Sequence, residues 1–332
     1  MPPCPFGPYR RAANKIFSPV RGNRPLPPKV LIDREQFPIM FAIRQATGKG
    51  LGVFASKSIP RGQRILTDQA LLTISSSDSG SILQQAHLLS TAGQKSLLSL
   101  SINPSKSSVF SWLESIWRSK SALRRTVSNH TILNIFRNNN FNIGNQIQAL
   151  FPQVARLNHS CVPNSQGNFN QALNAFTIHA TRDIGKDEEI TISYLDEHLG
   201  LRDSRQSALQ HGYGFVCDCS ACNPASFKAG EARRTEIKGQ LERFAEAASE
   251  DPNDEFEMML GLLDAYEAEA IRGREVSTMY IAAARKAFGL EKPEKGRELA
   301  LTGLRLEEEA VGKDSPFYVA TRSEVLALGV EA

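Results

Sequence analysis

The sequence has only five cysteines in 332 residues and no acidic residue before Asp33. Five cysteines are too few to cross-link a chain of this length into a disulfide scaffold. The longest apolar runs fall short of the ~18 residues that a membrane span needs, so no membrane association is expected. No apolar stretch follows the N-terminus, which disfavours a secretory signal. With 41% hydrophobic and 22% charged residues, the composition is that of a globular protein of about two domains.

Charge is distributed unevenly along the chain. Residues 1–30 hold eight prolines and no acid, so we expect a disordered basic arm. A mitochondrial presequence is less favoured because it would form an amphipathic helix. Residues 231–332 carry 14 Lys and Arg against 22 Asp and Glu, whereas residues 1–230 carry 25 against 13. This split predicts two modules, a basic one suited to nucleic acid and an acidic one suited to a basic protein, although solvated surface explains it equally well.

Hydrophobic periodicity divides the rest of the chain. Strand-like residues alternate with glycine and proline turns over residues 39–75 and again over 169–195. Residues 82–138 have a helical pattern, and 201–211 predict a short helix. From residue 230 onward apolar residues recur on one face of successive segments, which indicates stacked antiparallel helix pairs. These are TPR-like, although no clean repeat of about 34 residues emerges.

Three cysteines are clustered at Cys217, Cys219 and Cys222. One tight turn can direct all three thiols at a single tetrahedral ion, which is typical of structural zinc. Cys161 is our expected fourth ligand, giving a closed Cys4 site that would join two distant segments. The weaker alternatives for the fourth ligand are His211, His198 and Cys4. A redox dithiol is disfavoured because it needs only two cysteines.

Two further segments carry polar or flexible residues. The polar segment 158–164 predicts either a turn whose polar groups hydrogen-bond within the protein or a ligand site. A cysteine hydrolase with Cys161 as nucleophile and His159 as base is disfavoured because zinc would occupy the thiolate. The glycine-rich segment 48–52 lets backbone amides approach a ligand, but it matches no phosphate-binding pattern, so a hairpin turn is the default.

Taken together, four motifs resemble those of the SET-domain protein lysine methyltransferases. In chain order they are Gly48–Ala55, Leu157–Asn164, Glu188–Tyr194 and Tyr213–Cys222. The cysteine tail and helical C-terminal region are most similar to the SET-and-MYND subgroup and its fungal relatives, but residues 76–138 lack the cysteines of a MYND finger. The resemblance implies a mainly β SET fold of small curled sheets with a pseudoknot, a helical insert, a post-SET zinc site and an all-α, TPR-like C-terminal region.

The resemblance also divides the chain and assigns residues. It implies a basic arm at 1–30, a SET domain at 38–199 with its insert at about 82–138, a post-SET zinc segment at 200–224 and a helical domain at 230–332. The implied cofactor contacts are Lys49, Leu51, Asn139, Asn158, His159, Tyr194 and Phe215. The implied catalytic residues are Tyr194 and Tyr213. The implied zinc ligands are Cys161, Cys217, Cys219 and Cys222.

The implied activity is transfer of a methyl group from S-adenosylmethionine to the ε-amine of lysine in a histone or another protein. The amine, with an ordinary pKa of about 10.4, must be neutral to attack, which an apolar channel beside a sulfonium favours. Departures from the family pattern at Asn138–Asn140 and at Ala155–Arg156 are expected to alter the cofactor rim. The alternative function is a catalytically silent SET-like scaffold for protein binding. We also expect a monomer, weak nucleic-acid contact through the arm, and residence in the nucleus, the cytoplasm or both.

Overall fold

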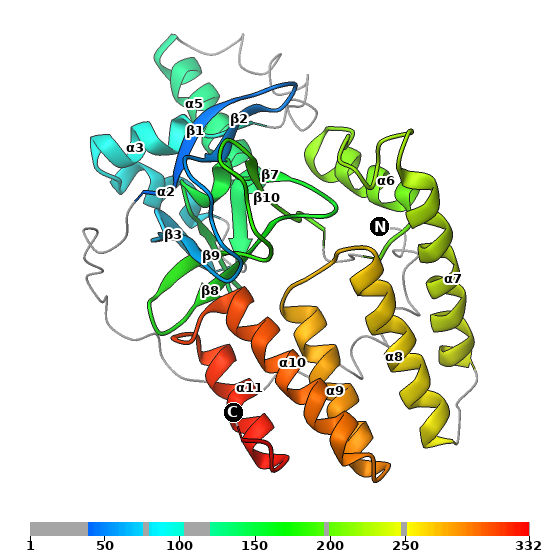
Figure 1. Cartoon of the computed structure of the whole chain (residues 1–332). Coiled ribbons are helices and arrows are strands. Elements are labelled where there is room, and N and C mark those ends of the chain that lie inside the picture. Colours follow the sequence, from blue (N-terminus) through cyan, green and yellow to red (C-terminus); the bar gives the residue numbers. More distant parts are fainter. Residues whose placement is uncertain (1–38, 76–79, 103–119, 196–198, 247–250, 332) are drawn as a thin grey trace.

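A computed structural model of the chain describes residues 39–75, 80–102, 120–195, 199–246 and 251–331. The predicted arm at 1–30, with Cys4, and His198 lie outside the described residues. Figure 1 shows small sheets with several helices in one part of the molecule and a row of helices in the other. None of the described helices is both long enough and apolar enough to cross a membrane.

Three small sheets make up the first part, as predicted for a SET fold. The first, in the order β1-β2-β10-β7, contains β1 (Phe41–Ala46), β2 (Gly50–Ala55), β10 (Glu189–Ile192) and β7 (Asn158–His159). The second, in the order β3-β9-β8, contains β3 (Arg64–Asp68), β9 (Ala175–Ala180) and β8 (Ser165–Asn170). The third, in the order β4-β6-β5, contains β4 (Leu72–Ser75), β6 (Ile147–Leu150) and β5 (Asn140–Asn142).

Strand β9 is central in its sheet, and all six of its residues are buried. Burial on both faces explains its apolar sequence, while Thr177 satisfies its hydroxyl by donating to the Asn168 carbonyl at 3.3 Å. In the neighbouring strand β8, a Cβ on Gly167 would lie 2.4 Å from the ring of Phe176. Glycine at this position therefore lets the aromatic core of the sheet close.

The predicted helical insert contains α2 (Ser81–Leu88), α3 (Thr91–Leu98) and α5 (Lys120–Asn139). Its apolar residues, among them Ile82, Leu97 and Phe136, form one buried cluster with Leu72 and Leu150 of the third sheet. The short 3-10 helix η3 (Val154–Arg156) then leads into β7. The insert thus covers one sheet and determines where the chain enters the polar segment 158–164.

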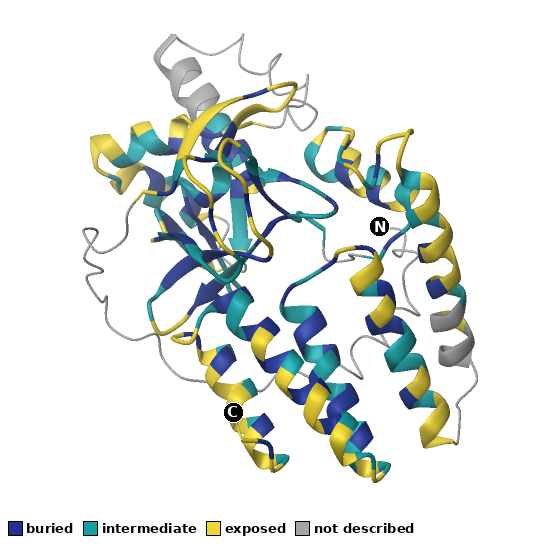
Figure 2. Cartoon of the chain, viewed as in Figure 1, coloured by how far each residue is buried: buried dark blue, intermediate teal, exposed yellow. Residues whose placement is uncertain are grey.

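In its described residues the C-terminal part consists of helices joined by short loops, as the periodicity predicted. It contains α7 (Phe227–Glu246), α8 (Pro252–Ala268), α9 (Arg274–Gly289), α10 (Pro293–Val311) and α11 (Pro316–Ala327). Consecutive helices pack on one another, and Figure 2 shows buried residues where α9 and α10 meet. A Cβ on Gly303 of α10 would lie 2.8 Å from Ile281 of α9, so this glycine permits their close approach.

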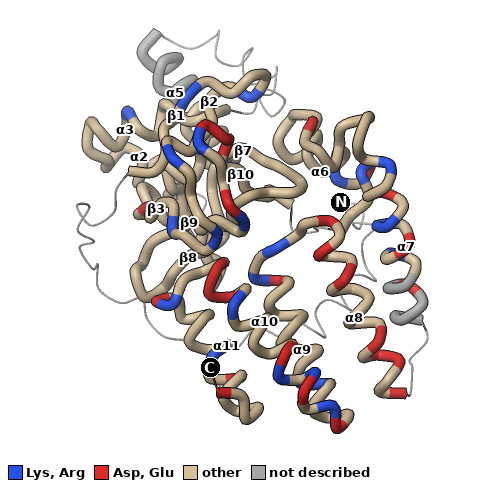
Figure 3. The backbone as a smooth tube through the Cα atoms, in the orientation of Figure 1, with Lys and Arg blue, Asp and Glu red and all other residues tan. Residues whose placement is uncertain are grey.

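Polar contacts join the helical part to the sheets. Arg61 pairs with Glu309 at 2.5 Å, and Arg64 of β3 pairs with Asp314. Figure 3 shows the acidic end of α10 close to the sheets. Helix α10 also packs against β8 and β9. The opposite charges predicted for the two modules therefore meet, in part, at their own junction.

Candidate functional site

The glycine-rich segment is a hairpin turn between β1 and β2, as the default interpretation predicted. Lys49 closes it by donating its backbone N–H to the Ala46 carbonyl at 3.0 Å. Gly48 and Gly50 have φ values of +74° and +79°, which glycine adopts without the steric cost of a side chain. The turn places Lys49 and Leu51 beside strand β10, which pairs with β2.

Asn158 on β7 is oriented by two acceptors. Its Nδ2 donates to the Leu51 carbonyl at 3.1 Å and to Glu189 Oε1 at 2.7 Å. Both amide hydrogens are thereby committed, so any further partner of this side chain must donate to Oδ1. Glu189 also binds Lys49, with Oε2 3.2 Å from Nζ. Asn158 therefore presents an acceptor oxygen that suits an ammonium group.

Sequence reasoning did not single out Glu189 as a site residue. The carboxylate joins the Lys49 turn to the Asn158 strand, although 140 positions separate Lys49 from Glu189. The available signal was an acidic residue entering an otherwise apolar strand, but the strand register that brings it to Asn158 cannot be read from the sequence.

His159 is buried, and both of its ring nitrogens face partners. Nδ1 accepts the backbone N–H of Tyr194 at 3.0 Å, and Nε2 lies 3.3 Å from Cys161 Sγ. Because Nδ1 is an acceptor, the neutral ring carries its hydrogen on Nε2, and sulfur is the acceptor. A base for Cys161 would need its lone pair on Nε2 instead. This geometry argues against the cysteine hydrolase and suits a metal-bound thiolate.

The three predicted aromatic residues lie together. The rings of Tyr194 and Tyr213 have centroids 4.8 Å apart, and Phe215 meets Tyr194 edge-on at 6.3 Å. The His159 ring lies 5.4 Å from Tyr194 and 6.1 Å from Phe215. Tyr194 donates its hydroxyl to the Leu157 carbonyl at 2.6 Å. Burial raises the pKa of Tyr194 well above its usual value, so the hydroxyl stays protonated.

Two of these rings, those of Tyr213 and Phe215, lie at the C-terminal end of a helix and just after it. Tyr213 is the last residue of α6 (Arg202–Tyr213), and Gly214 follows in the left-handed conformation with φ +81°. Its N–H donates to the Leu209 and Gln210 carbonyls, which ends the helix as glycine caps commonly do. The chain then turns, so that Phe215 and the cysteine cluster follow Tyr213 directly.

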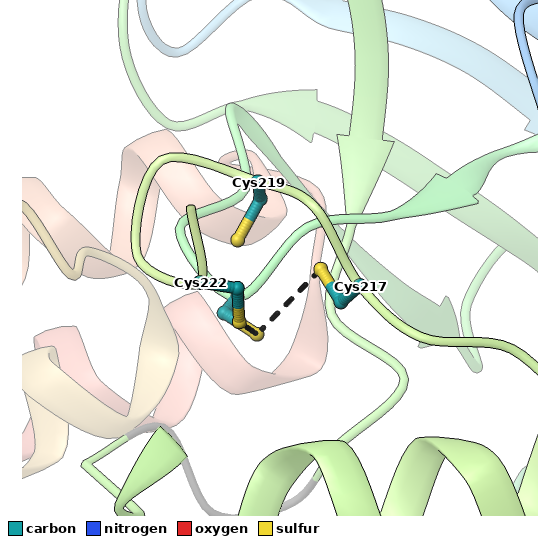
Figure 4. Close-up of side chains that lie close together, drawn as sticks. Cys217, Cys219 and Cys222 are labelled. Carbon is teal, nitrogen blue, oxygen red and sulfur yellow. Dashed lines mark hydrogen bonds between the residues drawn. The ribbon is translucent and has the colours of Figure 1, made fainter. Parts of the chain in front are cut away.

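The four predicted cysteines converge, with their sulfur atoms all within 4.8 Å of one another. Cys161 Sγ lies 3.6 Å from Cys222 Sγ and 4.0 Å from Cys217 Sγ. Zn–S bonds of about 2.3 Å in a tetrahedron imply sulfur separations of about 3.8 Å. Figure 4 shows Cys217, Cys219 and Cys222 turned toward one another on their loop. The donor set and spacing are compatible with zinc.

The electrostatics of the cluster point the same way. Neighbouring thiols and burial raise the pKa of Cys161, while the Cys161 thiol lowers the pKa of Cys219. Four crowded sulfurs therefore do not ionise together unless a cation compensates them. His211, an alternative ligand, lies exposed on α6 with Nδ1 2.8 Å from the Ser207 carbonyl, and it is not part of the cluster.

Asn139 is placed differently from the other predicted contacts. Its Nδ2 donates to the Ser101 and Ile135 carbonyls at 2.8 and 2.7 Å, and its Oδ1 accepts from the Ser101 hydroxyl. The side chain thus satisfies the end of α5, so a cofactor contact through it stays a prediction. Arg156, one of the departures from the family pattern, donates to the Ser99 carbonyl at 2.8 Å.

Comparison with known proteins agrees with this arrangement. A SET domain family model matches residues 50–195. Over 180 residues, the chain is 29% identical to histone-lysine N-methyltransferase set5 of Schizosaccharomyces pombe, covering 53% of this chain and 48% of that protein. Over 78 residues, it is 44% identical to protein-lysine N-trimethyltransferase SMYD5 of Danio rerio, covering 22% of this chain and 18% of that protein.

The chain therefore matches half or less of the length of these curated relatives. Among solved structures, the SET domain of LSMT bound to lysine and AdoHcy matches with a TM-score of 0.33 and 14% identity, over 90% of this chain and 89% of that one. The family model and the sequence relatives show that this chain contains a SET domain and has SET5 and SMYD lysine methyltransferases as homologues, which fits a SET-and-MYND-like protein.

Proposed function

We propose that the protein transfers a methyl group from S-adenosylmethionine to the ε-amine of lysine in a protein substrate. The observation that carries this proposal is the convergence of four distant segments. The Lys49 turn, the Asn158–His159 strand, Tyr194 and the Tyr213–Phe215 segment meet around one polar and one aromatic surface. The named relatives are histone-lysine and protein-lysine methyltransferases, which supports the same reaction class.

The polar surface suits the amino-acid end of the cofactor. Asn158 Oδ1 would accept from its ammonium group, because both hydrogens of Nδ2 are already committed. Lys49 beside it would attract the cofactor's carboxylate, at the cost of weakening its contacts with Glu189 and Asp218. Phe215, close to the His159 ring, would pack on the adenine. When bound, S-adenosylmethionine supplies an electrophilic methyl group on a cationic sulfur.

The aromatic surface suits the lysine. Tyr194 and Tyr213 would exclude water from the lysine side chain, and this loss of hydration together with the charge of the bound sulfonium favours the neutral amine. The Tyr194 hydroxyl stays protonated, and it is therefore an orienting group rather than a base. Alignment of amine and methyl group is the main contribution that such a site can make.

Zinc would hold the site together. Cys161 would connect the Asn158–His159 strand to the loop that follows Phe215, through Cys217, Cys219 and Cys222. A closed Cys4 centre leaves no open coordination position, so its role is structural.

The test is methyl transfer from labelled S-adenosylmethionine to core histones and to a cell lysate. Tyr194→Phe should lower turnover about 100-fold, because a misplaced reacting group costs that much. Tyr266→Phe is the matched control: Tyr266 is also largely buried but packs among the C-terminal helices, so its loss should leave turnover unchanged. Full activity of Tyr194→Phe would remove the role assigned to Tyr194.

If the folded, zinc-loaded protein binds S-adenosylhomocysteine but labels no substrate, the proposed methyltransferase activity is wrong. That result would instead favour the silent scaffold.

A further inference from the structure

A buried arginine lies beside the cysteine cluster. Arg205 of α6 is 3% exposed. It donates Nη1 to the Gly200 carbonyl and Nη2 to the Ala221 carbonyl at 2.8 Å, and Nη2 also lies 3.7 Å from Cys222 Sγ. Its Nε has no hydrogen-bond partner, and no carboxylate of the described residues pairs with it.

Such a guanidinium needs a negative charge nearby. Burying a cation against neutral carbonyl groups alone is costly, since carbonyls replace its water but not its counter-ion. The groups beside Arg205 that can become anions are the thiols, with Cys222 in contact and Cys161 close enough to interact. Neutral thiols would leave the charge uncompensated.

A zinc ion with four thiolates has the opposite need. Two positive charges on the metal and four negative charges on sulfur leave the centre with a net charge of −2. Buried anions of this kind require cations or N–H donors around them. Arg205 and the cluster therefore satisfy each other.

Neighbouring residues of α6 hold the backbone of the loop and not its sulfurs. Gln206 accepts from the Cys217 N–H at 2.8 Å and donates to the Cys217 carbonyl at 2.7 Å. Arg202 donates Nε to the Cys222 carbonyl at 3.0 Å. Among these three α6 residues, Arg205 alone reaches a thiol.

We propose that Arg205 is the counter-charge of a tetrathiolate zinc centre and positions α6 against it. The proposal rests on the zinc assignment made above. Because α6 ends at Tyr213, Arg205 links the metal to the aromatic wall through one rigid helix. It is a positioning residue, and it touches neither lysine nor methyl donor.

Zinc release to a coloured chelator tests this directly. Arg205→Met removes the charge at similar length and should speed release about tenfold or more, since hydrogen bonds to charged groups are the strong ones. Arg205→Lys keeps the charge and should recover most of the difference. Arg202→Met is the matched control, because it removes a contact with the same loop but none with sulfur, and release should change less than about threefold. Release from Arg205→Met at the wild-type rate, or no faster than from Arg202→Met, would overturn the proposal.

A measurement on the wild-type protein keeps the test independent of variant folding. Amide hydrogen exchange is followed with zinc bound and after chelation. The amides of α6 should lose protection once the cluster loses its charge, because Arg205 is then buried without an anion. Unchanged protection of α6 would refute the counter-charge role.

Zinc stoichiometry distinguishes a failure of the proposed methyl transfer from a failure of the Arg205 role. If the protein binds one zinc but transfers no methyl group, the proposed methyltransferase activity is wrong, while the counter-charge role of Arg205 can still be tested by zinc release. A protein that binds no zinc contradicts the Arg205 role, whatever its turnover.

Discussion

The substitution Gly52→Ala, which adds one methyl group, tests whether Asn158 binds the cofactor. A Cβ at this position would lie 2.6 Å from Glu189 Oε1 and 2.9 Å from Asn158 Nδ2, the two atoms that form the 2.7 Å hydrogen bond. Ordinary contact with a Cβ begins at 3.4 Å, so Gly52→Ala must push these atoms by about 0.8 and 0.5 Å. Backbone strain adds nothing, because Gly52 does not have a positive φ.

The displaced hydrogen bond sets the magnitude. Without its hydrogen bond to Glu189, Asn158 is no longer oriented toward the ammonium group of the cofactor. A hydrogen bond to a charged group contributes about 1.5–3 kcal/mol, so cofactor binding should weaken about 10- to 100-fold. Both displaced atoms end side chains that can turn aside, so the free energy of unfolding should fall by no more than about 1 kcal/mol. The two effects have different origins, since the first requires that Asn158 binds the cofactor and the second does not.

Calorimetric binding of S-adenosylhomocysteine, with a thermal melt of the same protein, measures both effects. Gly329→Ala is the matched control outside the site: Gly329, which follows α11, has φ +77° with no atom within 4 Å of an added Cβ. It should cost about 1–2 kcal/mol through strain and leave affinity unchanged. A folded Gly52→Ala protein with wild-type affinity would refute the assignment of Asn158 to the cofactor.

Two further predictions concern the rest of the fold. Burial, with a contribution from Arg64, lowers the pKa of His179 to about 3, whereas the unfolded chain takes up this proton below about 6.5; stability should therefore fall as pH drops, by about 2 kcal/mol between pH 7 and 5. Urea unfolding should show that His179→Gln loses less on acidification, and an equal loss in both proteins would contradict this. Arg274→Met leaves the Glu307 carboxylate, 1% exposed, without the guanidinium 2.9 Å away, and should cost about 1–3 kcal/mol because Arg274 itself is 37% exposed. Glu307→Gln should cost less, and the opposite order in denaturant titrations would be inconsistent with a buried carboxylate that needs the Arg274 charge.

Local sequence patterns predicted the features that depend on residues close together in the sequence. Alternating apolar residues gave the strands, helical periodicity gave the C-terminal helices, and the spacing of Cys217, Cys219 and Cys222 gave the cluster. Glu189 and Arg205 were not found, because their partners come from other segments and depend on register and helix phase. Asn139 shows the reverse problem: a motif can suggest a contact, but it does not reveal that the amide already bonds within its own helix end.

His159 and Cys161 lie close together in this geometry. His159 is the last residue of β7, and Cys161 lies in the bend that follows it, where its Sγ is 3.3 Å from Nε2 of His159. The opposite nitrogen holds the backbone of Tyr194 at 3.0 Å. One imidazole thus connects the sulfur cluster to the strand end that carries the proposed orienting hydroxyl. The cysteine cluster and the aromatic wall therefore both depend on the position of the His159 ring.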